Sequence, residues 1–267
     1  MLAIEELCAI LRHSVECDNI PLMAIDITGA RSKIERTKKH IRDFDAERIA
    51  FLGRDPYIVR PHFDRERNVT QSIVGPLPEI PESLALIAGD AAHNLRASLD
   101  YLACELVRSA GGSTKNVYFP ICESAKKYIA ESGGKTKGMP VAAKQVIDQI
   151  APYRGGHGGA LWSLHTLDIA DKHIVLTSIS ANIAKTVQLK MTPEPTEFSV
   201  VFSAPGLQEG DILGEVSGNS EADERIKFTF DIAFSQPDGL EGEPVVESLT
   251  YLVNMVETIT DHFYGMF

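Results

Sequence analysis

Hydrophobic residues recur at three- and four-residue steps through a long segment in the middle of the chain, residues 82–110. Leu84, Ile87, Ala91, Leu95 and Leu99 begin a series that continues to Leu106. This spacing places the apolar side chains on one face of a helix, about 40 Å long at 1.5 Å per residue. A proline-rich stretch precedes the segment, and two glycines follow it. We therefore predict one long amphipathic helix at the centre of the fold.

Other segments show helical patterning of lower regularity. For residues 28–52 we expect Thr28 as the N-cap and a sparse apolar stripe of Ile34, Ile41, Ile49 and Phe51. The C-terminal helix has apolar residues from Val245 to Phe263. The remaining predicted helices cover residues 4–11, 124–131, 141–150 and 160–173, with a flexible loop at 132–138.

Alternating patterns mark the strands. Residues 57–63 and 68–74 are joined by a charged turn and predict a hairpin. A second group of strands, separated by Gly-, Pro- and acid-rich loops, predicts an antiparallel meander at residues 186–191, 198–202, 212–216 and 226–234. The fold class is therefore α+β, a helical bundle with a hairpin and a meander, closed by the C-terminal helix. That last helix has an alternative role, which is to form the contact of a homodimer.

The same pattern suggests a division of the chain. Residues 1–27 form an N-terminal extension, and residues 28–180 form the helical bundle with the hairpin at 57–74. Residues 181–267 contain the meander and the C-terminal helix, which we expect to pack on the bundle as one domain.

Composition narrows the class of protein. The chain has 267 residues and a net charge of -11, which argues against non-specific nucleic-acid binding by the whole surface. Basic residues nevertheless concentrate in residues 31–67, and acidic residues dominate after residue 206. This pattern indicates either two solvated faces of opposite sign or a basic face for an anionic partner. Four cysteines without a CxxC pair, no signal-like N-terminus and no long apolar run predict a cytoplasmic protein without a membrane partner.

Candidate chemistry lies on two helices. His93, Arg96 and Asp100 share a face of the central helix, because they are spaced three and four residues apart. The predicted helix 160–173 carries His165, Asp168 and His173. If the two helices pack antiparallel, these side chains meet at one end of the bundle.

Three roles for this cluster remain open. A histidine oriented by a carboxylate, beside an arginine, is suited to acid–base chemistry or anion binding. A salt-bridge network that fixes helix register is the alternative. A metal site would use His93, His165 or His173 with Asp168 or Asp171, although the chain has no HExxH pattern and no closely spaced histidine pair there.

Two glycine-rich segments raise the question of phosphate binding. Residues 133–136, Gly-Gly-Lys-Thr, lack the first glycine of a phosphate loop, because Ile129 stands at that position, so we predict no cofactor. Arg154 and His157 lie in the loop Arg-Gly-Gly-His-Gly-Gly before a helix N-terminus. That arrangement predicts either an anion site or a tight turn.

Three blocks of sequence resemble an uncharacterised bacterial family: GDAAHNLRASLDYLA, PYRGG and LHTLDIADKH. Members of that family have similar HNLR and LDxxDKH helical motifs, and the resemblance covers about residues 28–180. The family more distantly resembles the HEPN superfamily, in which an RxxxxH motif performs metal-independent RNA cleavage at dimer interfaces. Arg96 matches the arginine of that motif, and Tyr101 stands at the histidine position. The resemblance implies that His93 or His173 would replace the missing base.

Three functions follow as hypotheses. The first is a HEPN-like protein that acts on RNA or another anionic ligand, as a nuclease or a degenerate relative, with a homodimer as its assembly. The second is a non-catalytic binding or assembly module with a structural polar network. The third is a metal-dependent hydrolase.

Overall fold

The computed structural model describes residues 4–12, 24–173, 179–189, 198–200, 206–217, 226–237 and 239–267. These residues form seven helices and six strands. The helices are α1 (Ile4–Arg12), α2 (Thr28–Leu52), α3 (Glu82–Ser109), α4 (Ala125–Lys135), α5 (Val141–Ile150), α6 (Gly159–His173) and α7 (Val245–Met266). The strands are β1 (Val59–Asp64), β2 (Val69–Val74), β3 (Ile179–Leu189), β4 (Phe198–Val200), β5 (Ile212–Ser217) and β6 (Ile226–Phe234). The predicted α+β class is confirmed.

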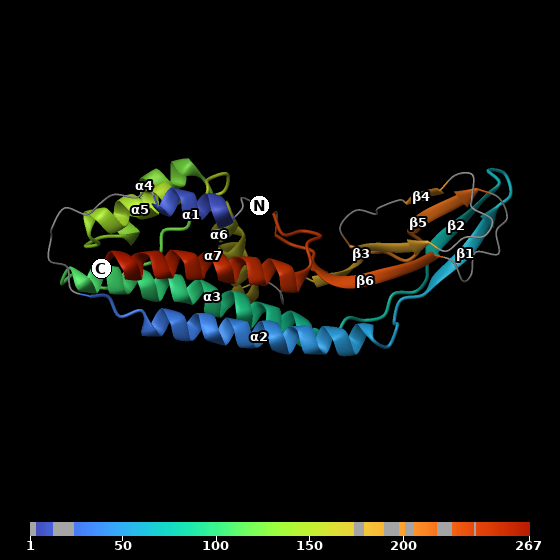
Figure 1. Ribbon diagram of the computed structural model, residues 1–267, viewed down its shortest axis with the longest axis horizontal. Coiled ribbons are helices and arrows are strands. Elements are labelled where there is room, and N and C mark those ends of the chain that lie inside the picture. Colours follow the sequence, from blue (N-terminus) through green and yellow to red (C-terminus); the bar gives the residue numbers. More distant parts are fainter. Residues whose placement is uncertain are drawn as a thin grey trace.

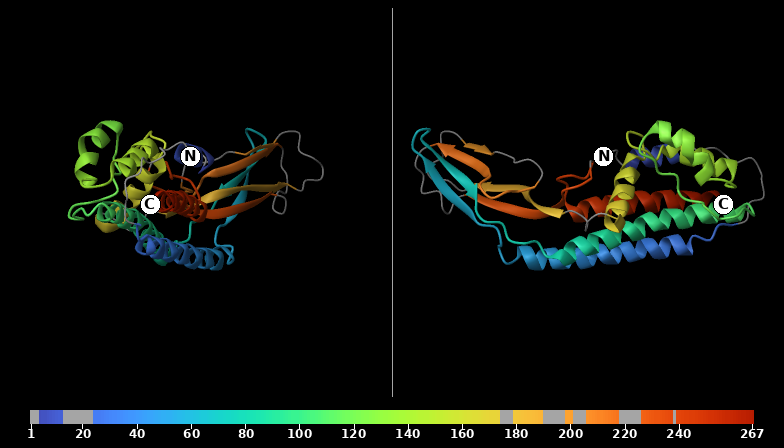
Figure 2. Two further views of the ribbon diagram at one scale, coloured as in Figure 1. Left: turned by 60° about the vertical axis from the view of Figure 1, so that its left-hand side comes forward. Right: turned by 180° about the vertical axis from the view of Figure 1, so that it is seen from behind.

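The molecule is elongated, and its helices and strands lie at different ends (Figure 1). The three long helices α2, α3 and α7 run side by side, and the shorter helices α1, α4, α5 and α6 cover one side of them (Figures 1 and 2). The strands extend from the end where α2 finishes and α3 begins. None of the described helices combines the length and the apolar character needed to cross a bilayer.

The core of the bundle is the apolar face of α3. Leu84, Leu95, Leu99, Leu102 and Leu106 are fully buried, as the three- and four-residue spacing predicts. The apolar positions of α7 from Val245 to Phe263 are buried as well, so α7 contributes a second face to the same core. The C-terminal helix therefore packs on α2 and α3 within the same chain.

The strands pair in an order that local patterning did not reveal. The predicted hairpin is confirmed as β1 and β2, with Val59 opposite Val74. Its second strand then pairs with β5, which gives a four-stranded sheet in the order β1-β2-β5-β4. β3 and β6 form a separate antiparallel pair. All these strand pairs are antiparallel, but the four later strands do not form one meander, because β4 and β5 join the hairpin while β3 and β6 pair with each other.

Three local expectations were wrong. The N-cap position of α2 is Ile27 instead of Thr28, and the Asp26 carboxylate accepts a hydrogen bond from the Thr28 backbone N–H. Ile49 is exposed, because the buried face of α2 follows Ile34, Thr37, His40 and Phe44. The loop expected at 132–138 begins later, since α4 continues through two glycines to Lys135.

Four of the eleven Lys and Arg residues in 31–67 are matched by acidic residues from the C-terminal part of the chain. Basic side chains from α2 and the hairpin form ion pairs with acidic residues that come after residue 206: Arg31 with Asp261, Lys38 with Glu257, Arg48 with Asp231 and Arg67 with Glu215, at 2.6–3.0 Å. The Arg67 guanidinium binds both oxygens of its carboxylate partner, at 2.6 Å each. The basic N-terminal half thus contacts the acidic C-terminal half of the same molecule.

Candidate functional site

The predicted polar cluster forms at the contact between α3 and α6. His93 Nδ1 lies 2.8 Å from Asp168 Oδ1, and Arg96 Nε donates to His165 Nδ1 at 3.3 Å. The two contacts run in opposite directions along the two helices, but α6 crosses α3 steeply instead of packing antiparallel along it as predicted (Figures 1 and 2). His173 ends α6, and its side chain lies outside the described residues. The structure therefore brings together four of the predicted side chains, with Asp100 joined to them through Arg96.

Arg96 is the centre of this network. Its side chain is only 7 % exposed, and its three donor nitrogens each have an acceptor within the chain. Besides His165, the acceptors are Asp100 Oδ1 at 2.6 Å and the Phe119 carbonyl oxygen at 3.1 Å. A buried guanidinium is costly unless it is hydrogen-bonded, and these three bonds, made by three of its five N–H donors, offset that cost for Arg96.

The Arg96–Asp100 pair also holds the chain after α3. The Phe119 N–H donates to Asp100 Oδ1 at 2.9 Å, while the Phe119 carbonyl accepts from Arg96. Both backbone groups of one residue are thus bound by the two members of one ion pair. The Phe119 ring is fully buried, and Cys122 N–H continues the contact by donating to the Pro152 carbonyl. The network consequently connects α3, residues 117–122 and α6.

His93 differs from Arg96 in its exposure. Its side chain is 43 % exposed, whereas the side chain of its partner Asp168 is 6 % exposed. A buried carboxylate that binds Nδ1 fixes the orientation of the imidazole and leaves Nε2 as the second site for a proton. This His93–Asp168 pair is the part of the cluster with the geometry of an acid–base group.

A pocket of about 610 Å³ lies on α3 beside this network. Asp100 reaches both: one of its oxygens belongs to the network, and the residue also lines the pocket. The other walls are the segment that enters α2, the following half of α3 and the chain after α3, and their polar and aromatic members include Asp26, Tyr101, Glu105, Arg108 and Tyr118. Tyr101 is therefore a pocket residue, half-exposed, in the place where the nuclease-like motif has histidine.

Gly29, in the first turn of α2, allows the Tyr101 ring to pack against α2 at this side of the pocket. A Cβ atom there would lie 2.6 Å from Cδ1 of Tyr101 and 3.0 Å from Cε1, so only glycine lets the ring pack this closely against α2. Asn116, on the opposite wall, has a φ of 61°, a left-handed conformation that asparagine tolerates better than most residues. Sequence reasoning missed Gly29, Asp26, Tyr118 and the Phe119 peptide, because no local periodicity connects them to α3.

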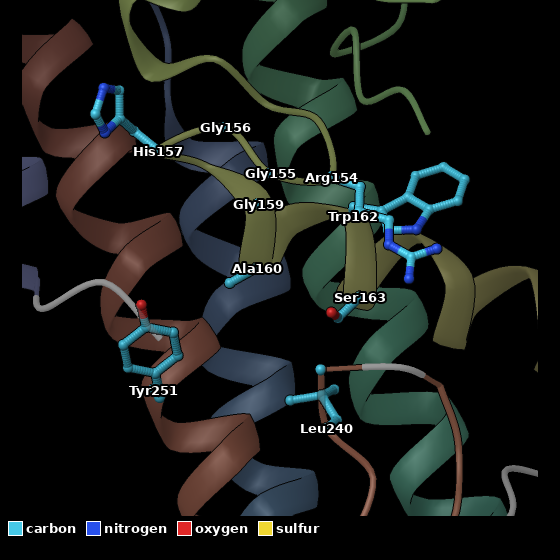
Figure 3. A pocket seen from close by; sticks show the side chains of 11 residues that line it. Arg154, Gly155, Gly156, His157, Gly159, Ala160, Trp162, Ser163, Leu240 and Tyr251 are labelled. Carbon is cyan, nitrogen blue, oxygen red and sulfur yellow. The ribbon is translucent and has the colours of Figure 1, made fainter. Parts of the chain in front are cut away.

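A second pocket, of about 300 Å³, lies at the N-terminus of α6. It contains the predicted anion-binding residues Arg154 and His157, together with Trp162, Tyr251 and Leu240. Figure 3 shows Arg154 beside Trp162 on one side of the loop and His157 on the other side. The two basic side chains do not converge on a common point. Their anion-binding role stays a prediction.

The metal hypothesis requires three or more ligands in one place. Among the described residues, no group of three His, Cys, Asp or Glu side chains has an arrangement that could hold a metal ion. Asp171 and His173, which the hypothesis also used, have side chains outside the described set.

Cys8, Cys104 and Cys122 are free thiols, and burial together with the nearby Asp100 carboxylate raises the pKa of Cys104.

Comparison with known proteins adds no family assignment. No protein-family model matches the chain, and no curated protein or solved structure is significantly similar to it. The resemblance to the bacterial family and to HEPN proteins therefore stays a prediction. Function has to be argued from the two pockets and the network alone.

Proposed function

We propose that the protein is a non-catalytic binding module in which the α3–α6 network is structural and the pocket on α3 is the ligand site. One observation carries the proposal: the Arg96 guanidinium is buried and uses its donors on Asp100, His165 and the Phe119 carbonyl. An arginine that acts on a substrate needs donors that face the substrate. Three of the five N–H donors of Arg96 are instead bound within the chain, one of them to Asp100, which lines the pocket.

The pocket itself supports a binding role. Its volume of about 610 Å³ lies within the range of about 300–1,000 Å³ that is usual for small-molecule sites. The charge distribution agrees with this role, because the basic side chains Arg31, Lys38, Arg48 and Arg67 are engaged in ion pairs within the chain. The net charge of -11 also favours a small ligand over non-specific binding of a polyanion such as RNA.

The proposal is tested by truncating Arg96. Arg96→Ala leaves the Asp100 carboxylate and the Phe119 carbonyl without their partner, which costs about 3 kcal/mol of unfolding free energy, as is usual for breaking a buried ion pair. Arg31→Ala is the matched control, because Arg31 also joins two helices, through Asp261, but both side chains are more than half exposed. Its cost is about 1 kcal/mol, because the exposed ion pair contributes little and the guanidinium also lies 5.2 Å from the centre of the Tyr264 ring. Urea unfolding curves of both variants measure the difference, and equal small losses would contradict a structural role.

A second candidate function rests on the His93–Asp168 pair. A half-exposed imidazole held by a buried carboxylate favours acid–base chemistry, and this is the form in which a HEPN-like RNA-cleaving homodimer remains a hypothesis. Incubation of RNA with the protein in EDTA distinguishes the two candidates. We expect intact RNA with the wild type. Metal-independent cleavage that disappears in a folded His93→Gln variant would overturn the binding-module proposal, and sedimentation analysis would then show whether the active species is a dimer.

A further inference from the structure

The charges that line the α3 pocket are predominantly negative. Three carboxylates, those of Asp26, Asp100 and Glu105, and one guanidinium, that of Arg108, line it, and the Asp100 carboxylate is matched from outside the lining by Arg96. Arg108 forms an ion pair with Glu105, so the cation in this lining is already matched by an acid of the same helix. Hydrogen bonding by Thr28 lowers the pKa of Asp26, which therefore stays ionised well below neutral pH. Asp26 is thus the one carboxylate of this lining that has no ion pair among the described residues, and it leaves the pocket with one net negative charge.

Two aromatic side chains share this pocket. Tyr101 is 49 % exposed and Tyr118 is 51 % exposed, and they come from α3 and from the chain after it. The contact with Gly29 fixes the position of the Tyr101 ring on one side. Exposed aromatic faces attract cations because of the negative charge of the ring face, and the attraction is strongest for organic cations and ammonium groups. The rings and the cavity are observations independent of the acidic side chains.

We infer that this pocket binds a small organic cation that carries ammonium groups. The inference rests on the proposed function, since it names the ligand class of the same site. The Asp26 carboxylate supplies the charge complement, the tyrosine rings supply contact area, and about 610 Å³ is enough for a linear polyamine. A metal ion is a weaker match, because the described residues offer no set of three converging ligands. An anion is a weaker match because Arg108 is already paired with Glu105.

Spermidine is the probe, measured by isothermal titration at low ionic strength with the full chain. Tyr101→Leu keeps an apolar contact and removes the π face, so it should raise Kd about tenfold, the equivalent of about 1.4 kcal/mol. Asp26→Asn removes a partly screened charge and should raise Kd about threefold. Both side chains are exposed, so both variants are expected to fold, which circular dichroism verifies.

Two matched variants control for general attraction to an acidic protein. Tyr264→Leu removes a half-exposed tyrosine of α7 outside the pocket. Asp64→Asn removes a carboxylate that caps the hairpin turn by accepting from the Glu66 and Arg67 N–H groups, much as Asp26 accepts from Thr28. Neither variant should change the Kd for spermidine. An equal loss of affinity in these controls and in the pocket variants would contradict a site at Tyr101.

Two further probes separate the inference from the proposed function. Glutarate is a linear anion and 1,6-hexanediol is a linear neutral molecule, and both are used for comparison with spermidine. Spermidine that fails to bind, or binds no more tightly than hexanediol, overturns the cation inference. If glutarate binds instead with a dependence on Tyr101, the binding-module proposal survives while the ligand class is wrong. If no probe binds and the protein cleaves RNA, both are wrong.

Discussion

Polar side chains inside the bundle each have a specific partner. The Thr37 hydroxyl donates to the Lys33 carbonyl at 3.1 Å and lies 3.3 Å from the Ala91 carbonyl of α3. Arg36 Nε donates to His40 Nε2 at 3.1 Å, and Arg96 has its three acceptors. Buried polar groups cost free energy unless they are paired. Polar residues on an otherwise apolar helix therefore indicated from the sequence that α3 has polar partners, but the sequence did not identify those partners.

Tyr57 is the exception at the residue scale. Its ring packs between Phe51 and Phe230, with centroid distances of 6.1 and 4.8 Å, and its buried hydroxyl has no hydrogen-bond partner among the described residues. Burial raises its pKa to about 12. Because an unpaired buried hydroxyl is unfavourable, Tyr57→Phe should leave the unfolding free energy unchanged or raise it by up to about 1 kcal/mol.

Tyr128 supplies the control for that prediction. Its hydroxyl donates to Asp148 Oδ1 at 2.7 Å, and burial followed by this bond raises its pKa. Tyr128→Phe should therefore lose about 1 kcal/mol of unfolding free energy. Urea unfolding of both variants measures the contrast. A larger loss in Tyr57→Phe than in Tyr128→Phe would show that the Tyr57 hydroxyl has a partner after all.

His40 makes stability depend on pH. Burial, and then the adjacent Arg36 charge, lower its pKa in the folded state. The unfolded chain protonates this histidine near its ordinary value of about 6.5, so below that pH the unfolded state binds more protons than the folded state. Its contribution to stability is complete above about pH 6.5 and falls as pH decreases. When the pH is lowered from 7.5 to 5.5, the urea midpoint should fall less for His40→Gln than for the wild type. An equal fall in both proteins would show that His40 is not the source of this pH dependence.

At the scale of elements, the periodic helices were predicted well and their buried faces less well. Residues 82–110 and the C-terminal helix have strong apolar series, and the structure confirms both. In α2 the sequence suggested Ile49 for the core, yet Thr37 and His40 occupy it, because polar side chains with a partner, Ala91 of α3 for Thr37 and Arg36 of α2 for His40, can replace aliphatic ones. The α4 helix runs through Gly133 and Gly134, where local propensity alone predicted a loop.

The approach of α2 to α3 depends on Gly29. Gly29→Ala favours the helix by up to about 1 kcal/mol but places a Cβ atom 2.6 Å from the Tyr101 ring, which has to move. In a Tyr101→Leu background the aromatic clash is absent, so the same substitution should be more stabilising there. A double-mutant cycle in urea measures this coupling. Additive effects would show that the ring does not rest on Gly29.

At the scale of the whole molecule, the α+β class could be predicted and the long-range pairing could not. Alternation identified the hairpin and the later strands, but the pairing of β2 with β5 joins segments about 140 residues apart, and local patterns carry no information about it. The site shows the same limit. Asp100 and Tyr101 of α3 were singled out from the sequence, but Glu105 and Arg108 of the same helix were not. Asp26, Gly29 and Tyr118 reach the pocket only through the tertiary fold.

The hydrogen bonds of Arg96 hold residues 117–122 and α6 against α3. Amide hydrogen exchange in wild type and Arg96→Lys tests this claim most directly, because lysine keeps the charge and loses the planar fork that reaches three acceptors. We predict exchange at least about tenfold faster at the Phe119 amide and in α6, equivalent to about 1.4 kcal/mol, with the interior of α7 unchanged. Unchanged protection at Phe119 and α6 would contradict the claim.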